Sequence, residues 1–267
     1  MAPIIALAGN HDGMVAPNTD AETLQAFLEN FCQSEFVITP EAGGLTRTAQ
    51  IQPGVFFTFE APFVRILVLY SNTLEDPGVI SSENGTYQGV PDAQLDYLQA
   101  ALKRVKTENY KGALILAHHH PIYAATGARG GSPKMQKQID DICAQQDVWP
   151  HAVLSGHAHD YERFTRERGT AEVPYIICGN GGHALPHFTT KRPAPARTPF
   201  SLKQPAGSDA VTLENYDGKN YGYLRIIANA TQLRIEYHPS GDGPDVKTPD
   251  DFVTVDLVSR KLVHFKG

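Results

Sequence analysis

The residues best suited to chemistry are histidines that follow short apolar runs. Residues 153–155 form such a run, which leads through Gly156 into His157 and His159, with only Ala158 between them. In extended backbone, residues two apart point to the same side, so both imidazoles can face one place. Neutral imidazole is the commonest side-chain ligand for transition metals. The pair is therefore a candidate metal site, although two polar loop residues would give the same pattern.

Two other segments repeat this arrangement. Residues 4–8 predict a buried strand that runs into the Gly-Asn-His-Asp sequence of residues 9–12. Residues 113–117 predict another buried strand, which runs into the His-His-His-Pro sequence of residues 118–121. In open α/β sheets, ligands bind beyond the carboxyl ends of the strands. Three strand ends of this kind predict a single crevice lined by histidines.

These segments together resemble a known family. Residues 9–12 (Gly-Asn-His-Asp), 119–121 (His-x-Pro) and 156–159 (Gly-His-Ala-His) are similar to the last three signature blocks of the calcineurin-like metallophosphoesterases, and residues 160–163 (Asp-Tyr-Glu-Arg) resemble the purple acid phosphatase branch. The resemblance covers residues 4 to about 183. It implies an α/β fold with two sheets in an α-β-β-α sandwich. It also implies hydrolysis of phosphate monoesters or diesters, with a small phosphate ester as the substrate.

The family resemblance implies a centre of two divalent or trivalent metal ions, with Fe, Zn and Mn as candidates. Two such ions roughly 3.5–4 Å apart would hold the phosphate and acidify a bound water. Asn10, His119 and His157 would bind the second metal, and His159 would bind the first. Read by itself, Asn10 is equally well explained as an asparagine of a turn.

The resemblance also assigns residues that act without binding metal. His11, paired with Asp12, would stabilise the leaving oxygen or the phosphoryl charge. His118 is expected in the core, and Tyr161 and Arg163 are expected to pack beneath the loop. The candidates for contact with the substrate are His120, His183 and Tyr123.

One departure from the family limits the expected activity. The family's two earlier blocks, Asp-x-His and Gly-Asp-x-x-Asp/Tyr, supply metal-binding carboxylates, and no Asp-x-His occurs in this sequence. Residues 241–245 fit the second pattern as a string, but a Gly/Asp/Pro cluster after residues 239–240 is typical of a turn. The first metal then keeps only His159, so we expect one weak metal site or none, and impaired activity. We also expect the family's first strands to lie outside this sequence.

Two alternatives to a phosphoesterase with impaired activity are a non-catalytic relic that serves as a binding module, and a subunit completed by a partner chain that supplies the carboxylates.

The rest of the sequence predicts one domain over residues 1–267, incomplete at its N-terminal side. Thr19 and Glu22 form a capping box before an apolar helical face, and Ser132 with Pro133 marks another helix start. Residues 184–220 predict an irregular insertion, and residues 221–267 predict late β-hairpins. The other elements expected are strands at 55–60, 64–70 (a central strand) and 174–178, and a helix that begins after Asp92.

Composition narrows the classes of protein. The chain has 267 residues and a formal net charge of −6, and no run of Lys or Arg predicts a nucleic-acid partner. No apolar stretch is long enough to span a bilayer, and no signal peptide is visible, which leaves the location unknown. The three cysteines are expected in the core rather than in disulfides. An unpaired sheet edge would promote self-association.

Overall fold

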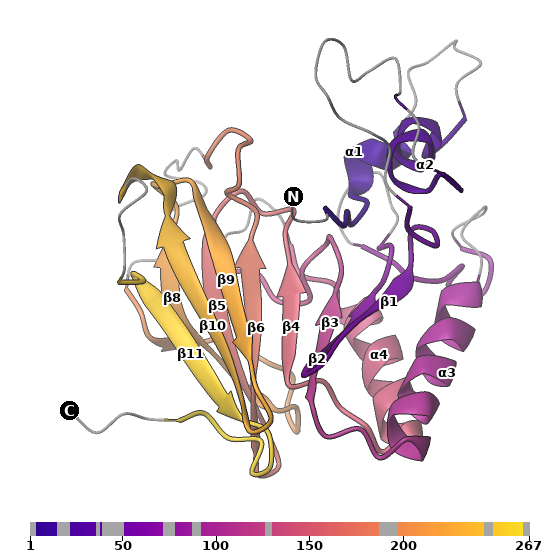
Figure 1. The fold of residues 1–267 in the computed structure, drawn as a ribbon. Helices are drawn as coiled ribbons and strands as arrows, with labels where there is room; N and C mark the ends of the chain where they lie inside the picture. Colours follow the sequence, from indigo (N-terminus) through magenta and orange to yellow (C-terminus); the bar gives the residue numbers. More distant parts are fainter. Residues whose placement is uncertain are drawn as a thin grey trace.

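The computed structural model describes residues 4–14, 22–35, 38, 51–71, 78–86, 92–125, 130–186, 197–242 and 248–263. The described chain contains a large sheet and a small sheet (Figure 1). The large sheet has the order β1 (Phe57–Ala61), β2 (Val64–Val68), β3 (Ala113–Ala117), β4 (Ala152–Ser155), β6 (Ala171–Cys178), β5 (Tyr161–Arg168), β8 (Ala210–Asp217) and β7 (Phe200–Ser201). The small sheet has the order β11 (Asp251–Asp256), β10 (Gln232–Pro239) and β9 (Gly222–Ala228). The helices are α1 (Asn10–Gly13), α2 (Gln25–Phe31), α3 (Ala93–Thr107), α4 (Pro133–Gln146) and the 3-10 turn η2 (Ser240–Asp242).

Four adjacent strands of the large sheet, β2, β3, β4 and β6, run parallel. Every residue of β3 is buried, as expected for a strand covered on both faces. Because β3 and β4 are neighbours, the segments that follow them meet at the same edge. The amide of Gly156 donates to the carbonyl of His119 at 3.0 Å and joins the two segments directly.

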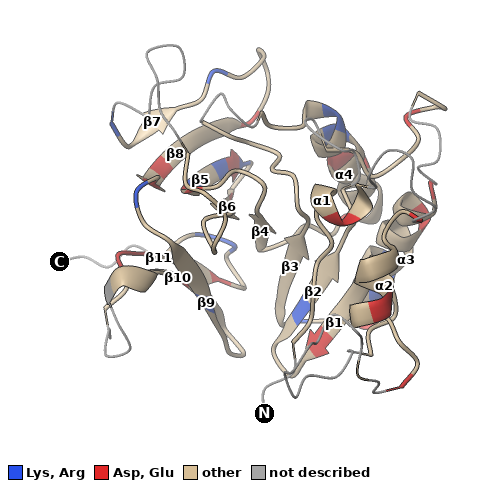
Figure 2. Cartoon of the chain, turned by 90° about the horizontal axis from the view of Figure 1, so that it is seen from above, with Lys and Arg blue, Asp and Glu red and all other residues tan. Residues whose placement is uncertain are grey.

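Helices and the small sheet cover opposite faces of the large sheet (Figure 1). The helix side buries Leu98 and Leu102 of α3 with Met135 and Ile139 of α4. The other side packs strands β3 to β6 against the apolar face of β10, and residues of both sheets form a second core. These layers confirm the predicted α/β fold with two sheets. The helices α1 and α2 lie near the ends of the strands and not over the outer face of the small sheet (Figures 1 and 2).

The two long helices begin in different ways. The Ser132 hydroxyl accepts from the amide of Met135 at 3.3 Å, and Pro133 is the first helical residue, as predicted. Asp92 stands at the start of α3 but does not cap it with its side chain. Its carboxylate instead accepts from the amide of Ser82 at 2.8 Å, so it holds a loop against the helix. Thr19 of the predicted capping box lies outside the described residues.

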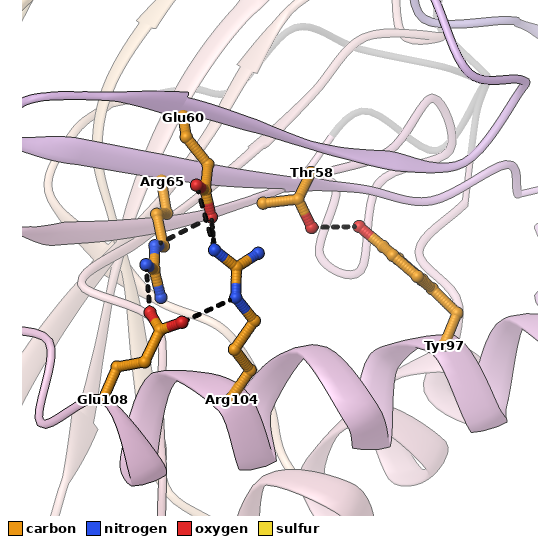
Figure 3. A network of polar contacts seen from close by, with 6 residues as sticks. All are labelled: Thr58, Glu60, Arg65, Tyr97, Arg104 and Glu108. Carbon is orange, nitrogen blue, oxygen red and sulfur yellow. Dashed lines mark hydrogen bonds and ion pairs between the residues drawn. The ribbon is translucent and has the colours of Figure 1, made fainter.

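A polar network joins α3 to the edge hairpin of β1 and β2 (Figure 3). Arg65 contacts Glu60 at 3.0 Å and also pairs with Glu108, and Arg104 contacts the same two carboxylates at 2.8 and 2.9 Å. Thr58 is hydrogen-bonded to a tyrosine hydroxyl of α3 nearby. Because both glutamates and Arg104 are substantially exposed, the network fixes geometry more than it adds stability.

The prediction of a strand at residues 4–8 is wrong. Ile4 and Ile5 are 59% and 44% exposed, and no strand is formed there. The side-chain amide of Gln52 takes the place of a neighbouring strand, since it accepts from the amide of Ala6 at 3.0 Å and donates to its carbonyl at 3.1 Å. The Gln52 side chain thus bonds to this segment at a place where backbone hydrogen bonds to a neighbouring strand were expected.

Two further expectations are corrected. The region 184–220 is not irregular throughout, because it contains β7 and β8, and β8 pairs along β5 with Val211 and Leu213 in the core. Residues 187–196 of that region lie outside the described residues. The strand predicted at 64–70 is β2, which is the second strand from the edge and not a central one.

The late hairpins agree with expectation, since β9, β10 and β11 are antiparallel neighbours. All three cysteines are free, and Cys143 is buried. None of the helices in the described ranges is long and apolar enough to cross a membrane.

A buried histidine makes the stability depend on pH. Burial, helped by the charge of Arg260, lowers the pKa of His151 to about 4 from 6.5, and its Nδ1 accepts from the amide of Leu114 at 2.9 Å. Below pH 6.5 the unfolded chain therefore takes up this proton first, and stability falls until the pH reaches about 4. Near pH 5 the loss should be about 2 kcal/mol relative to pH 7. The variant His151→Gln keeps an acceptor, and urea unfolding should show that it lacks this part of the pH dependence; an unchanged dependence would contradict the assignment.

Candidate metal centre

The predicted crevice exists at the carboxyl ends of the parallel strands. It is a cavity of about 460 Å³. Figure 2 looks onto this end of the molecule, with α1 beside the ends of the central strands. The crevice is lined by residues of all three predicted loops and of the glycine-rich loop after β6: Asn10, His11, His119, Gly156, His157, His159, Cys178, Gly179, Gly181, Gly182 and His183.

Three donor atoms from three separate segments converge in the crevice. His119 Nε2 lies 2.8 Å from Asn10 Oδ1 and 3.1 Å from His157 Nδ1. Ligands in neighbouring positions on one metal, each bound at about 2.1 Å, lie roughly 3.0–3.4 Å apart. The contacts of 2.8 and 3.1 Å are hydrogen-bond distances and lie close to that spacing, so the amide oxygen and the two imidazole nitrogens are candidate ligands of one metal ion.

Close packing and an unusual backbone angle fix these ligands. A Cβ at Gly9 would lie 2.9 Å from His119 Cε1, so only glycine leaves room for that ring. His157 has a φ of 63°, in the left-handed region that residues other than glycine rarely adopt. Strain of this kind is concentrated at functional sites and persists where the surrounding structure holds it. At Gly179 a Cβ would lie 1.8 Å from the carbonyl oxygen of Ala158, so the neighbouring loop also needs a glycine.

His159 faces a different neighbour. Its Nδ1 lies 3.2 Å from Nδ1 of His183, and the two rings have centroids 4.2 Å apart. His183 also stacks beside His11, with centroids 6.5 Å apart. Three histidines thus line the exposed side of the crevice, beside the group formed by Asn10, His119 and His157. This contact between His159 and His183 was not foreseen, because sequence alone does not show how the glycine-rich loop folds back.

Other predicted site residues take different positions. The carboxylate of Asp12 accepts from the amide of Gly9 at 2.7 Å and so closes the turn, and its pairing with His11 stays a prediction. His120 is fully buried beneath the crevice, where its Nδ1 and its amide both contact the hydroxyl of Ser71. A ring in that place can support His157, at a centroid distance of 4.2 Å, rather than touch a substrate.

Tyr123 points away from the crevice. Its ring is 6% exposed and packs on Tyr175 with centroids 4.9 Å apart, on the helix side of the sheet. Burial raises the pKa of its hydroxyl. Tyr123 is not among the residues that line the crevice, so the structure does not place it where the predicted contact with substrate would need it.

The residues expected in the core are there. His118 is 1% exposed, and burial lowers its pKa to about 4, so the ring is neutral near pH 7. Tyr161 and Arg163 both contact the carboxylate of Asp251 and pack beneath the loop, as predicted. Asn180, which sequence reasoning missed, is fully buried, and its side-chain amide donates to the carbonyl of Asn220 at 2.8 Å. It therefore braces the glycine-rich loop that carries His183.

Within the part of the chain that the structure describes, no group of three or more His, Cys, Asp or Glu side chains is placed to hold a metal ion. The candidate site differs from such a group because one of its three donors is the side-chain amide oxygen of Asn10. A carboxylate between two metals is what a binuclear centre would need in addition.

Gly9 gives a test of how the chain positions its ligands. In the variant Gly9→Ala, the added methyl must push the His119 ring away, because its nearest atom would be only 2.9 Å distant. Metal affinity should fall about 10- to 100-fold, which is usual when a residue that orients a ligand is changed. Calorimetric titration with Zn²⁺ measures this, and Gly54→Ala, where a Cβ meets no atom within 4 Å, is the control. Equal affinities in the two variants would contradict the proposed geometry.

The family model for calcineurin-like phosphoesterases matches residues 1–161. This match covers more than half of the sequence, and the chain belongs to the calcineurin-like phosphoesterase family. The chain is also similar to two proteins of Arabidopsis thaliana. It is 25% identical over 209 residues to "Probable purple acid phosphatase 20", covering 75% of this chain and 42% of that protein. It is 25% identical over 174 residues to "Probable inactive purple acid phosphatase 9", covering 61% of this chain and 25% of that protein.

Two solved structures are similar to this chain at low identity. A structure titled "GAP50 the anchor in the inner membrane complex of Plasmodium" has a TM-score of 0.48 and 16% identity, and the alignment covers 80% of this chain and 59% of that chain. The structure titled "Structure of PhoD" has a TM-score of 0.47 and 12% identity, and the alignment covers 79% and 43%. This chain spans less than half the length of the two plant relatives. Both plant relatives are named as purple acid phosphatases, which agrees with the resemblance of residues 160–163 to that branch.

Proposed function

We propose that this chain binds one divalent metal ion in the crevice and hydrolyses phosphate esters there with low turnover. The observation that carries the proposal is the convergence of Asn10 Oδ1, His119 Nε2 and His157 Nδ1 within 2.8–3.1 Å contacts. Membership of a phosphoesterase family supports the reaction class. A bound metal ion would supply Lewis acidity toward a phosphoryl oxygen and toward water.

The other residues of the crevice would bind and orient the ester. His11 and His183 are exposed at its open side, where a protonated imidazole could hold an anionic phosphate or donate a proton to the leaving oxygen. His159 lies 3.2 Å from His183, so the first metal of the family would have either His159 alone or these two histidines as protein ligands. Because the described residues contain no group of three or more His, Cys, Asp or Glu side chains that could hold a metal ion, we expect weak occupancy and impaired turnover.

The hydrolysis test uses metal-free protein and two chromogenic substrates. After addition of Mn²⁺, Zn²⁺ or Fe²⁺, hydrolysis of p-nitrophenyl phosphate or bis(p-nitrophenyl) phosphate should rise above that of the variant Asn10→Ala, which loses one donor. Asn229→Ala, at an exposed turn far along the sequence, is the matched control and should behave as the unmodified chain. Metal that neither raises the melting temperature nor supports any hydrolysis would favour the reading as a non-catalytic relic.

A second candidate function is a subunit whose site is completed by an added β-segment. An apolar cavity of about 360 Å³ continues the inter-sheet face over β1 to β3. It is lined by Ile5, Ala6, Leu7, Phe57, Phe59, Ile66, Val68 and Ala117. The small sheet stops at β9, where adjacent Ile226 and Ile227 are 37% and 38% exposed, on opposite faces of the strand. A strand added at this edge would cover the cavity and bring its own side chains to the crevice.

Self-association of the chain tests whether strand β9 is open to pairing with another strand. Without an added segment, two copies of the chain should pair through β9, so light scattering should show dimers or larger species at micromolar concentrations. Ile227→Lys puts a charge on the edge and should shift the distribution to monomer. Lys219→Gln, in the preceding turn, should leave it unchanged. A monodisperse monomer of the unmodified chain would contradict this candidate function.

A further inference from the structure

A second cavity lies at the opposite end of the large sheet from the crevice. Its volume is about 530 Å³. It is formed by the end of α3, the start of β3, the segment before β4, the turn between β5 and β6, and Arg260. Strand β3 separates it from the crevice by five residues, which is roughly 17 Å at about 3.3 Å per residue. We call this cavity the basic pocket.

The charge of the basic pocket is opposite to that of the whole chain. Its lining contains four cationic side chains, Lys106, Lys111, Arg168 and Arg260, against one carboxylate, Asp147. The chain itself has a formal net charge of −6. The carboxylate of Asp147 is 86% exposed and lies 4.0 Å from Lys106 Nζ, so it offsets at most one of the cations. An excess of positive charge in a concave place of an acidic protein focuses the field on an anion.

Two guanidinium groups of the pocket both contact Trp149. Arg260 is held rigidly, because its Nη2 donates to the carbonyls of Trp149 at 2.9 Å and Pro150 at 2.7 Å. Arg168 lies over the Trp149 ring, 3.2 Å from its centroid. Burial, and after it the charge of Arg168, lowers the pKa of Arg260. In the described part of the chain, neither arginine forms an ion pair with a carboxylate, so a bound anion would relieve their mutual repulsion.

Favourable contacts with a helix C-terminus explain only part of the positive charge of the basic pocket. Lys106 Nζ donates to the carbonyl of Gln146 at 3.0 Å, near the end of α4, which is the usual place for a cation at a helix C-terminus. The exposed Lys111 and the stacked Arg168 have no such partner among the described residues. Their donors remain available to a ligand.

We propose that the basic pocket binds a small molecule that carries two or more phosphate groups and recognises it through those groups. Guanidinium pairs match the geometry of phosphate oxygens, and three excess positive charges suit a polyanion better than a single carboxylate. The ligand is not recognised by stacking of a base, because Arg168 already covers a face of Trp149 and Arg65 lies 4.3 Å from the centroid of Tyr110, the other aromatic ring of the lining.

The test is calorimetric titration of the full chain with pyrophosphate, tripolyphosphate, ATP and inorganic phosphate. A background variant with His119→Ala and His159→Ala, kept in chelator, removes binding at the crevice, so the result is independent of the proposed hydrolysis. We expect tripolyphosphate and pyrophosphate to bind more tightly than inorganic phosphate. ATP should bind no more tightly than tripolyphosphate, because an arginine already covers one face of both Trp149 and Tyr110. Rising salt should weaken all of them.

Two substitutions that each remove one positive charge test whether pyrophosphate binds in the basic pocket. Arg168→Gln and Lys111→Gln should each weaken pyrophosphate binding at least about 10-fold, since a lost charge-assisted contact costs about 1.5–3 kcal/mol. Lys103→Gln, on the exposed face of α3 and outside the pocket, removes the same charge and should change affinity less than 2-fold, by our expectation for a distant exposed charge. Because Lys111 is exposed, its variant should fold normally even if Arg168→Gln does not. Absence of binding at millimolar pyrophosphate, or equal weakening by Lys103→Gln and Lys111→Gln, would overturn the proposal.

Discussion

Asp251→Ala should lower the free energy of unfolding by about 3–5 kcal/mol, the usual cost of leaving a buried partner charge alone. Asp251 lies at the start of β11 and receives three hydrogen bonds from β5: Arg163 Nε at 2.7 Å, Arg163 Nη2 at 3.0 Å and the Tyr161 hydroxyl at 2.8 Å. The side chains of Arg163 and Asp251 are 13% and 10% exposed. One carboxylate therefore joins the large sheet to the small sheet, and its loss leaves a guanidinium buried without its partner.

Urea unfolding followed by circular dichroism measures this loss. Asp250→Ala is the matched control, because Asp250 is exposed and adjacent, and its variant should differ from the unmodified chain by less than about 0.5 kcal/mol. Replacing both partners, in Arg163→Met with Asp251→Leu, should recover much of the stability, since apolar pairs often replace buried ion pairs without loss. A cost below 1 kcal/mol for Asp251→Ala alone would show that the sheets are held together by their apolar core only.

His119→Ala should weaken binding of Zn²⁺ or Mn²⁺ at least about 100-fold. Removing a residue that merely orients a ligand costs about 10- to 100-fold, and His119 is itself the central donor of the site. Its Nε2 is the atom within reach of both Asn10 Oδ1 and His157 Nδ1, so its loss leaves only two of the three candidate donors. Hydrolysis that depends on the metal should disappear with the same substitution.

The controls for this variant separate binding from catalysis. His11→Asn changes a residue of the same crevice that is not among the three donors, so metal affinity should stay within about 3-fold while turnover falls. His238→Gln changes a histidine of the small sheet and should affect neither quantity. Equal metal affinity of His119→Ala and the unmodified chain would place the metal elsewhere.

The sequence predicted the elements whose pattern is fully local. The all-apolar run of β3 is typical of a strand buried on both faces, and Ser132 with Pro133 is typical of a helix start. The strand β8 was missed because its apolar residues alternate with polar ones inside a region of mixed composition, and it becomes recognisable only when β5 is beside it. Residues 4–8 show the opposite error, because their apolar run predicted a strand that the structure does not contain. The Gln52 side chain bonds to the backbone of this segment instead of a neighbouring strand.

The sequence likewise predicted some features of the candidate site and not others. The motifs predicted that Asn10, His119 and His157 would meet, and the structure brings them together. For His119 and His157 the reason is that β3 and β4 are parallel neighbours, whereas Asn10 reaches the same edge from a segment that is not a strand. Sequence spacing says nothing about depth, which is why His120 was expected at the surface of the crevice and lies beneath it. It also says nothing about how a glycine-rich loop folds, so the contact of His183 with the ring of His159 had to come from the structure.

The most direct test of a metal centre in the crevice is anomalous X-ray diffraction from a crystal of this chain soaked in Zn²⁺. The arrangement described above predicts a single strong peak at about 2.0–2.2 Å from Asn10 Oδ1, His119 Nε2 and His157 Nδ1. A crystal with no peak at these atoms, while the three side chains keep their mutual contacts of 2.8 and 3.1 Å, would contradict the assignment of the crevice as a metal site.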